Sequence, residues 1–541
     1  MNLYQILRFL RPMQNPVGFD LIDFLELAFA ALAVAAILGR RKNEAALRWV
    51  AERPRWALSL LAALPIVLRL CLLHNHPVPV PTVSDDFSYL LLGDTLRHFR
   101  LANPVHPMHR FFETVFVLQQ PSYSSIYPLG QGIVLIFGWA GVLASIGILC
   151  ALVYWMLRGW LTPAWALVGG LLAVMLFGPL NQWTNNYWGG AVSAIAGCLV
   201  FGAIPRKNST LLGLGLGLQI LTRPFEAVLL LVCAAPFVFR WLRWRALLAL
   251  VPVLGLTLLQ NHAVTGDWTK LPYMLSREQY GVPTAFTFQK MPEPHRPLTP
   301  EQRLDYLAQK DVHDSSGGYW LRWAGRLKFL RFFLLPPLYI ALLYFDRRFL
   351  WAAGCVLFFS LGTNIYPYFY PHYVAAVACL ILLMAVAGLR RAPRVLLSLC
   401  AAHFIFWYSV HLLGNQPVFE ATGPYESWDY INFGDSEGRI AIDRTLAQAP
   451  GKQLVFVRYS PRHLLREWVH NEADIDAARV VWALDLGEDE DARLRAYYPQ
   501  RTVWIVEPDS VPPRLTAVPT NVPTNVPAAL PTPIPSYSPA Q

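Results

Sequence analysis

Long runs of apolar residues recur along this chain and constrain its fold more than any other feature. Only 15% of its 541 residues are charged, 55% are hydrophobic, and the mean hydropathy is +0.35. Soluble globular proteins average about 25% charged residues, and a run of about 20 apolar residues can cross a bilayer as a helix. We therefore expect a polytopic α-helical membrane protein.

The apolar runs predict about twelve membrane spans. They cover residues 21–39, 56–73, 139–157, 163–180, 188–204, 209–222, 224–240, 245–261, 327–345, 347–363, 372–388 and 394–413. The run at 209–222 is short for a span. The seven cysteines all lie within apolar runs, so no disulfide framework is expected.

The distribution of Lys and Arg predicts how these spans are oriented. Basic residues gather in alternate loops, at 40–55, 158, 206–207, 240–245, 347–348 and 390–394. The short loops 181–187 and 364–371 contain no Lys or Arg. The positive-inside bias makes the basic loops cytoplasmic, and it explains the net charge of +10 better than nucleic-acid binding does. We expect a multi-pass protein of a bacterial inner membrane, with a transmembrane domain over 1–413 whose outer side receives the long loops 74–138 and 262–326.

The chain changes character after the last apolar run. Stretches 453–458, 480–484 and 502–506 resemble buried strands, and 488–497 resembles a helix. These elements predict a small extracytoplasmic α/β domain over 414–507. From residue 508 to 541 the chain is rich in Pro, Thr and Val and has few bulky side chains, so we expect an extended, disordered tail.

Two adjacent carboxylates, Asp85 and Asp86, follow directly on the apolar run 56–73. Ionised groups at a membrane boundary are costly unless hydrated or paired, and they are often functional. One interpretation is that Ser84 or Asp85 caps a helix predicted over 87–99. The other is that one carboxylate acts as a general base. The two interpretations are compatible, because a cap would also fix the geometry of the base.

Two basic side chains are expected at the same outer boundary. Arg223 could bind a phosphate through its planar guanidinium, or it could simply pair with Glu226, three residues further on. His372 could offset negative charge or have a purely structural role. Lys270 and Arg277, in the loop 262–326, are weaker candidates.

The outer loop after the fourth predicted span carries Asn185, Asn186, Tyr187 and Trp188. These residues could bind sugar hydroxyls and stack on a sugar ring. Trp and Tyr at a membrane interface are also the ordinary aromatic belt of membrane proteins. Both interpretations stay open from the sequence.

A divalent metal is conceivable at the first outer loop. His106, His109 and Glu113 could bind one together with Asp85 or Asp86. Their spacing matches no compact zinc signature, so the metal stays undetermined. No other cofactor is expected.

The first outer loop resembles that of the GT-C glycosyltransferases. The stretch Ser84-Asp85-Asp86-Phe87-Ser88-Tyr89 is similar to the Asp-Glu-x-x-Tyr motif of the branch that contains protein O-mannosyltransferase, aminoarabinose transferase and RgtA/B/C/D-like proteins. The segment from Gln119-Gln120-Pro121 through Tyr127-Pro128 to Phe137-Gly138 stands in the place of their Lys-Pro-Pro segment.

This resemblance implies an inverting transfer of a sugar from a polyprenyl-phosphate lipid to an extracytoplasmic glycan, lipid or protein acceptor. Asp85 matches the catalytic acidic residue of the motif and Asp86 its companion, while Tyr89 and Tyr127 are expected to contact substrate. Gln120 stands where relatives often have a phosphate-binding Lys. Phosphate contacts are therefore expected from Arg223 or His372 as well as from Gln120.

Two other functions compete with this one. A transporter or flippase for lipid-linked saccharides would use ionisable residues near the middle of the membrane, whereas the predicted spans are nearly free of charge. A non-catalytic membrane protein could instead present its outer domain to a partner. About twelve spans exceed what such anchoring requires.

Overall fold

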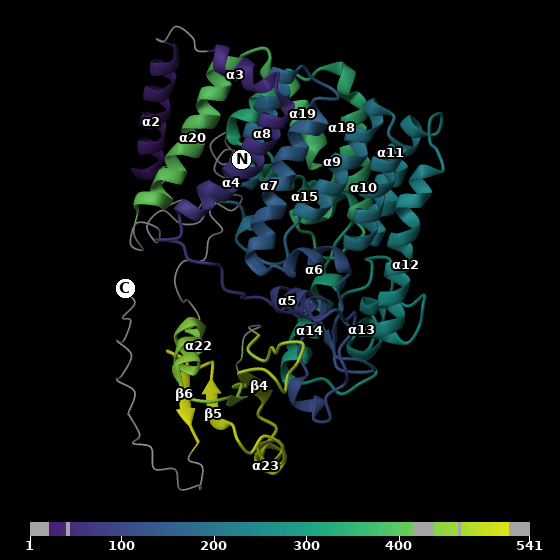
Figure 1. Ribbon diagram of the computed structural model, residues 1–541, viewed down its shortest axis with the longest axis vertical. Helices are drawn as coiled ribbons and strands as arrows, with labels where there is room; N and C mark the ends of the chain where they lie inside the picture. The colour runs from purple at the N-terminus through teal and green to yellow at the C-terminus, as the bar shows by residue number, and fades with distance from the viewer. Residues whose placement is uncertain (1–20, 39–43, 415–437, 462, 464–466, 519–541) are drawn as a thin grey trace.

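The computed structural model describes residues 21–38, 44–414, 438–461, 463 and 467–518. A bundle of helices makes up most of the molecule, and a small sheet lies at one end of it (Figure 1). The bundle contains α2 (Leu21–Leu38), α3 (Glu44–Ala51), α4 (Pro54–Cys71), α7 (Gly138–Leu157), α8 (Pro163–Phe177), α9 (Ala191–Arg206), α10 (Ser209–Thr222), α11 (Pro224–Val238), α12 (Arg245–Thr265), α17 (Pro336–Leu343), α18 (Leu350–Thr363), α19 (Ala378–Leu389) and α20 (Pro393–Leu413).

Five helices of the described part of the chain are long and apolar enough to cross a membrane. They are Pro54–Cys71, Gly138–Leu157, Arg245–Thr265, Pro371–Leu389 and Pro393–Leu413. Shorter apolar helices, among them α8, α9, α10 and α11, lie beside them. The count of about twelve spans stays a prediction.

The predicted span 327–345 is wrong as a single helix. The structure divides it into η3 (Leu327–Phe329), α16 (Leu330–Phe333) and α17 (Pro336–Leu343). Proline has no N–H to donate to the preceding turn and clashes with it, so Pro336 and Pro337 end one helix and begin the next.

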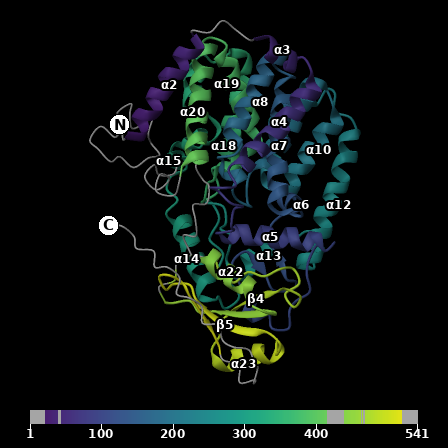
Figure 2. The ribbon, with the colours of Figure 1, turned by 60° about the vertical axis from the view of Figure 1, so that its left-hand side comes forward.

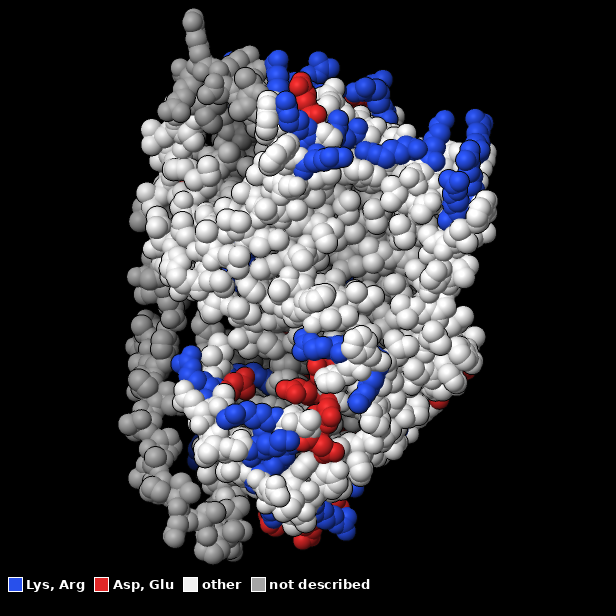
Figure 3. All heavy atoms as spheres, in the orientation of Figure 1, with Lys and Arg blue, Asp and Glu red and all other residues white. Residues whose placement is uncertain are grey.

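On the face of the molecule that Figure 3 shows, charged residues form three zones. Lys and Arg gather at the end of the bundle that lies away from the sheet, a band with almost no charge follows, and mixed charges surround the sheet end. The uncharged band is what a bilayer requires of the surface it covers. The basic end holds the Lys and Arg of the loops that we expect to be cytoplasmic.

Close contacts between backbones hold the centre of the bundle together. A Cβ atom added to Gly197 of α9 would lie 1.8 Å from the carbonyl oxygen of Ala376 in η5 (Pro371–Val377). A Cβ added to Gly388 of α19 would lie 1.9 Å from the carbonyl oxygen of Ala341 in α17. Small residues permit such close approach of helices in membranes, where packing replaces the hydrophobic effect as the driving force.

The outer segments form a layer between the bundle and the sheet. Within it, α5 lies across the end of the bundle, as Figure 2 shows. The layer consists of α5 (Ser84–Arg97), η1 (His109–Phe112), β1 (Val117–Leu118), β2 (Ser124–Ser125), α6 (Leu129–Leu135), η2 (Gln182–Thr184), α13 (Pro272–Tyr280) and α14 (Pro300–Asp314), whereas α15 (Tyr319–Arg326) lies beside the bundle (Figures 1 and 2). The layer carries Asp85 and Asp86 in α5, while Arg223 and His372 lie at the ends of bundle helices.

The sheet has the strand order β4-β3-β5-β6. Its strands are β3 (Gln453–Val457), β4 (Val480–Leu484), β5 (Thr502–Glu507) and β6 (Arg514–Ala517), accompanied by α22 (Arg439–Gln448) and α23 (Glu488–Tyr497). Strand β3 is parallel to β4 and β5, whereas β6 pairs antiparallel with β5. The three predicted strands and the helix 488–497 are observed.

Strand β6 corrects the prediction that the disordered tail begins at residue 508. Residues 514–517 instead pair with the edge of β5, where Leu515 lies opposite Val506. An edge strand exposes unpaired backbone groups that a neighbouring segment can satisfy. The rest of the predicted tail, 519–541, and most of the segment that leads into the sheet, 415–437, lie outside the described residues.

A pair of Gly→Ala substitutions tests the close packing of α9. Gly197→Ala should destabilise the protein by about 1–3 kcal/mol, because the new methyl group has no room. Gly354→Ala in α18 should be neutral or stabilising, because a Cβ there meets no atom within 4 Å and Ala favours a helix. Thermal unfolding in detergent measures both. Equal stability of the two variants would contradict the packing described.

Candidate active site

The acidic motif lies in the first turn of α5. Val83 is the N-cap residue, in an extended conformation, and no side chain caps the helix. The prediction that Ser84 or Asp85 is the cap is therefore wrong, because the helix already begins at Ser84. Acidic residues in a first turn interact favourably with the positive end of the helix dipole. This position turns Asp85 and Asp86 toward two different sets of partners.

Asp86 is an anchor between loops. It is only 2% exposed; its Oδ1 accepts a hydrogen bond from the backbone N–H of Tyr187 at 3.0 Å, and its Oδ2 accepts one from the N–H of Thr82 at 3.2 Å. The Tyr187 hydroxyl in turn donates to the carbonyl oxygen of Pro79 at 2.7 Å. Burial raises the pKa of Asp86 to about 7, although the two N–H groups act in the opposite direction.

Asp85 is half-buried, and its partners differ from those of Asp86. Its Oδ1 accepts a hydrogen bond from the hydroxyl of Tyr127, whose ring stacks on that of Tyr89 with centroids 4.0 Å apart. Burial raises the pKa of Asp85, while the Tyr127 hydrogen bond and the positive charge of Arg223 act to lower it. A carboxylate with a raised pKa is a stronger base, as general base catalysis requires.

Arg223 connects α10 to α11 and lies close enough to Asp85 for its charge to act on that carboxyl. Its Nη1 lies 3.2 Å from Oε1 of Glu226, whose side chain is 2% exposed. Glu226 also accepts a hydrogen bond from the Tyr366 hydroxyl at 3.4 Å. The guanidinium lies over the ring of Tyr373, 4.6 Å from its centroid.

The pairing of Arg223 with Glu226 is the structural alternative foreseen in the sequence. It uses one of the five N–H groups of the guanidinium. Among the residues that the structure describes, Nε and Nη2 of Arg223 donate to no other side chain or carbonyl. Arg223 therefore has donors left for an anion.

His372 is buried in a cluster of aromatic rings. Its ring lies 5.5 Å from that of Tyr370, in parallel, and 5.0 Å from that of Trp188, edge to face. Trp188 also meets Tyr370 edge to face, at 5.1 Å. The cluster borders the acidic site, because Trp188 follows directly on the Tyr187 whose N–H holds Asp86.

Asn185 and Asn186 were both predicted to contact substrate, and their side chains have different surroundings. The side chain of Asn185 accepts a hydrogen bond from Nε of Arg69 at 2.8 Å and donates to the carbonyl oxygens of Pro179 and Asn181. These bonds direct its amide into the bundle rather than toward Asp85. Asn186 is buried, and its Oδ1 has no hydrogen-bond partner among the described residues.

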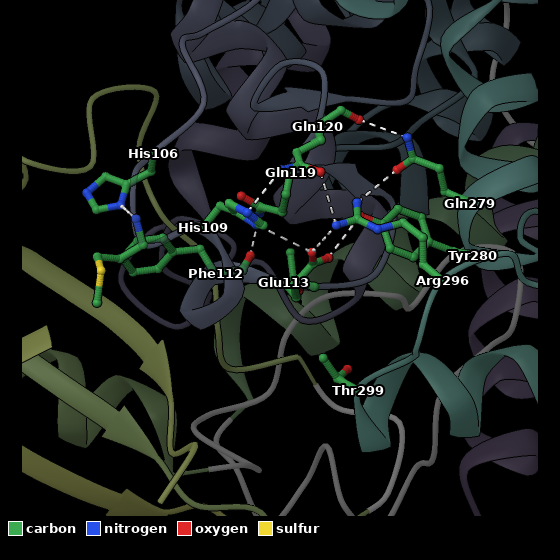
Figure 4. A network of polar contacts seen from close by, with 12 residues as sticks. His106, His109, Phe112, Glu113, Gln119, Gln120, Gln279, Tyr280, Arg296 and Thr299 are labelled. Atoms are coloured by element: carbon green, nitrogen blue, oxygen red, sulfur yellow. Dashed lines mark hydrogen bonds and ion pairs between the residues drawn. The ribbon is translucent and has the colours of Figure 1, made fainter. Parts of the chain in front are cut away.

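Gln120 does not join Asp85 and Arg223. Figure 4 shows it in a separate polar network with His109, Arg296 and Gln279. Its Nε2 lies 3.0 Å from His109 Nε2, and its Oε1 lies 3.4 Å from Arg296 Nη2. Arg296 also pairs with Glu113 at 3.5 Å. The guanidinium of Arg296 therefore contacts Gln120 from another part of the chain, and the Glu113 carboxylate already offsets its charge.

The weak metal candidates do not converge. His106 turns toward the sheet end, where its Nε2 lies 3.2 Å from Asp476 Oδ1 and 3.1 Å from the Tyr498 hydroxyl. His109 and Glu113 belong to the network of Figure 4, with Nδ1 and Oε1 3.9 Å apart. Within the described ranges, no three His, Cys, Asp or Glu side chains are grouped as a metal site requires.

Lys270 and Arg277, the two other basic candidates, make their contacts within the loop 262–326. Lys270 pairs with Glu278. Arg277 donates to the carbonyl oxygens of Pro283 and Thr284 at 3.0 and 2.9 Å. Neither is placed beside Asp85 by these contacts.

Sequence reasoning missed two residues near the site. Arg69 is fully buried in α4 and donates to the carbonyl oxygens of His76 and Pro77, each at 2.9 Å. These bonds fix the loop that leads from α4 to α5. A lone Arg inside an apolar run is the signal that could have revealed it. Asp305 of α14 has a pKa that burial raises to about 7, with smaller contributions from the charges of Asp85 and Glu301, and nothing in its local sequence sets it apart.

Comparisons with known proteins give a likeness in structure alone. No protein-family model matches the chain, and a search of curated proteins found no significant match. The crystal structure of ArnT from Cupriavidus metallidurans bound to undecaprenyl phosphate is similar with a TM-score of 0.44 and 12% identity, over 83% of this chain and 92% of that one. The apo state of the same protein gives 0.44 and 14%, over 86% and 93%. The function is therefore argued from the chain's own site.

The buried position of Asp86 predicts a characteristic pH dependence. Folded Asp86 keeps its proton up to about pH 7, whereas in the unfolded chain it ionises above about pH 4. The unfolded chain therefore binds fewer protons in this window, so stability should fall as pH rises, by about 1.4 kcal/mol per pH unit. Asp86→Asn does not titrate and should lack this contribution.

The measurement is the unfolding temperature of both proteins in detergent between pH 4 and 7. Every other titrating group is shared, so the difference between the two curves isolates Asp86. Parallel curves would contradict the raised pKa.

Proposed function

We propose that this protein is a membrane glycosyltransferase that moves a sugar from a polyprenyl-phosphate donor to an extracytoplasmic acceptor. One observation carries the proposal. A half-buried carboxylate, Asp85, is oriented by Tyr127 and lies within the electrostatic reach of Arg223, at one end of a bundle of apolar helices. A base beside an anion-binding cation, next to a lipid phase, suits transfer from a lipid phosphate.

The proposed reaction is a single inverting displacement. A hydroxyl or amine of the acceptor attacks C1 of the donor sugar while Asp85 takes its proton. The bond between C1 and the phosphate oxygen breaks, and the electron pair stays on the polyprenyl phosphate. Arg223 stabilises that developing negative charge, as preorganised cations do most effectively away from bulk water.

The remaining residues have supporting roles in this proposal. Asp86 fixes the first turn of α5 against the loop that carries Tyr187, so that Asp85 keeps its direction. Tyr89 stacks on Tyr127 and limits the positions of its hydroxyl. Trp188 and His372 present aromatic surface beside the site. The basic end of the bundle supports placing this site outside the cytoplasm.

Asp85→Asn tests the base. Transfer should fall about 10²–10⁴-fold, the usual contribution of a general base, while the Asn oxygen still accepts the Tyr127 hydrogen bond and folding is retained. The assay follows radiolabel from a panel of undecaprenyl-phosphate monosaccharides into membrane acceptors. Ser84→Ala, one residue away and without a capping bond, is the matched control. Unchanged transfer by Asp85→Asn would remove the mechanism.

Arg223→Lys tests the phosphate contact. Lysine keeps the charge that Glu226 requires but lacks the planar fork, so affinity for undecaprenyl phosphate should fall about tenfold. Binding is measured by the shift in unfolding temperature on titration with the lipid. Glu226→Gln should keep or increase that affinity, because it frees the guanidinium.

A purely structural role of Arg223 predicts the opposite pattern. Both variants would then lower stability without changing the affinity for undecaprenyl phosphate. That result would exclude Arg223 as the phosphate ligand.

A further inference from the structure

The helix that carries Asp85 is in direct contact with the sheet end of the molecule. We call the sheet, together with α22, α23 and the segment 467–476, the sheet module. Helix α5 lies between this module and the bundle (Figures 1 and 2). Its residues Phe87, Leu91 and Asp94 follow at i, i+4 and i+7, so they share one face of the helix. That face is turned toward the sheet module.

Phe87 is held between two side chains of the module. The centroid of its ring lies 4.1 Å from that of His470, and the guanidinium of Arg439 lies over the ring, 4.6 Å from its centroid. Phe87 is only 5% exposed. A cation above an aromatic ring is attracted by the ring quadrupole, and more strongly where water is excluded. The ring of Phe87, and not only its apolar volume, therefore fixes it in this place.

Arg439 and His470 are themselves fixed within the module. Arg439 is the first residue of α22, and its guanidinium donates to the carbonyl oxygen of Glu467 and, at 3.1 Å, to that of Trp468. It also contacts the ring of His470. The two groups that hold Phe87 thus form one unit with the segment 467–476.

This segment is bonded both to the sheet and to the outer layer. The side chain of Asn471 donates to the carbonyl oxygen of Trp482 in β4 at 2.8 Å and accepts from its N–H at 2.9 Å. The N–H of Ala473 donates to Oδ2 of Asp94 at 2.8 Å, and the Tyr123 hydroxyl donates to the carbonyl oxygen of Asn471 at 3.0 Å. The segment therefore transmits the position of the sheet to α5.

Another face of α5 is packed against the segment that leads into the bundle. The ring of Tyr89 stacks on that of Tyr127. A Cβ atom added to Gly93 would lie 2.7 Å from Cβ of Leu135 in α6. Because α5 is held from two sides, its rotation about its own axis depends on both. That rotation sets the direction of Asp85 in the first turn.

We propose that Phe87, Arg439 and His470 are positioning residues of the transfer reaction, through which the sheet module orients Asp85. This rests on the proposed transferase function. Phe87 lies two residues after Asp85, so losing its ring contact lets the first turn of α5 shift. A displacement of about 1 Å can reduce the rate of a reaction about 10²-fold. The sheet module is then a working part of the transferase and not a separate binding domain.

Phe87→Leu tests the contact, because leucine keeps the apolar character and removes the ring. Transfer at saturating donor should fall about 10- to 100-fold. The affinity for undecaprenyl phosphate should be unchanged, because Arg223 is untouched. The assay is the transfer of radiolabel from undecaprenyl-phosphate monosaccharides, with lipid affinity measured by the shift in unfolding temperature.

Phe111→Leu is the matched control. Phe111 is 2% exposed and meets Phe456 of β3 edge to face, with centroids 6.4 Å apart. The substitution therefore removes an equally buried ring from the contact with the sheet module without touching α5. It should lower the unfolding temperature as Phe87→Leu does and leave transfer unchanged. Equal loss of transfer in the two variants would overturn the proposal.

His470→Ala removes the contact from its other side. It should lower transfer as Phe87→Leu does. The double variant should be no slower than the slower single variant, because both substitutions break the same contact. Effects that multiply in the double variant would overturn the proposal, since they would show that the two residues act independently.

Hydrogen exchange of the full chain in nanodiscs gives a measurement that needs no substrate. Phe87→Leu should speed exchange of the amides of α5 and leave those of β3 unchanged, whereas Phe111→Leu should leave α5 unchanged. Unaltered exchange of α5 in Phe87→Leu would reject the positioning role alone. If the wild type transfers no sugar while α5 exchanges as expected, the transferase function fails, and the role in transfer fails with it.

Discussion

Two backbone N–H groups that hold the Asp86 carboxyl are the contacts on which the site depends. They come from Thr82, before α5, and from Tyr187, in a loop about a hundred residues later. Burying a carboxyl group is costly without such bonds, so the first turn of α5 has a defined place only when both segments are in position. Because Asp85 belongs to the same turn, the bonds to Asp86 also fix the orientation of the Asp85 side chain. Asp86 fixes this turn of the helix, and in the proposed function Asp85 is the residue that acts on substrate.

The charge balance of the site explains why this division is useful. Arg223 already pairs with Glu226, and its charge lowers the pKa of Asp85. A donor lipid would add a negatively charged phosphate. Asp86, with a pKa of about 7, is partly protonated at neutral pH and contributes less negative charge than an ordinary carboxylate. Buried charges are tolerated where they are paired and hydrogen-bonded. The cluster meets that condition and still leaves guanidinium donors for an anion.

Much of this arrangement follows from sequence pattern, because spans are long and apolar and their ends are chemically distinct. Most of the long apolar helices, the strands β3 to β5, and the placing of Asp85 and Arg223 at the same end of the bundle were predicted on that basis. The break at Pro336 was missed because the prediction followed the continuous apolar run and gave the two prolines too little weight. Strand β6 was missed because its segment has the composition of a disordered tail, and it becomes a strand only by pairing with the edge of β5.

Contacts that depend on distant loops could not be predicted. Gln120 was expected at the phosphate but meets Arg296, about 180 residues away in the chain. Asp305 lies on an ordinary polar helix, and only the fold buries its carboxyl group and raises its pKa. Asn185 was expected to face substrate, yet a buried Arg69 takes its side chain. Local sequence cannot specify such pairings, since their partners are set by tertiary structure.

The most direct test of the central claim is a structure of the protein with undecaprenyl phosphate, determined by electron cryomicroscopy in nanodiscs. The account predicts density for the phosphate within about 3 Å of the guanidinium of Arg223, on the side that faces Asp85. Phosphate density at the Gln120–Arg296 network, or at the basic end of the bundle, would contradict it.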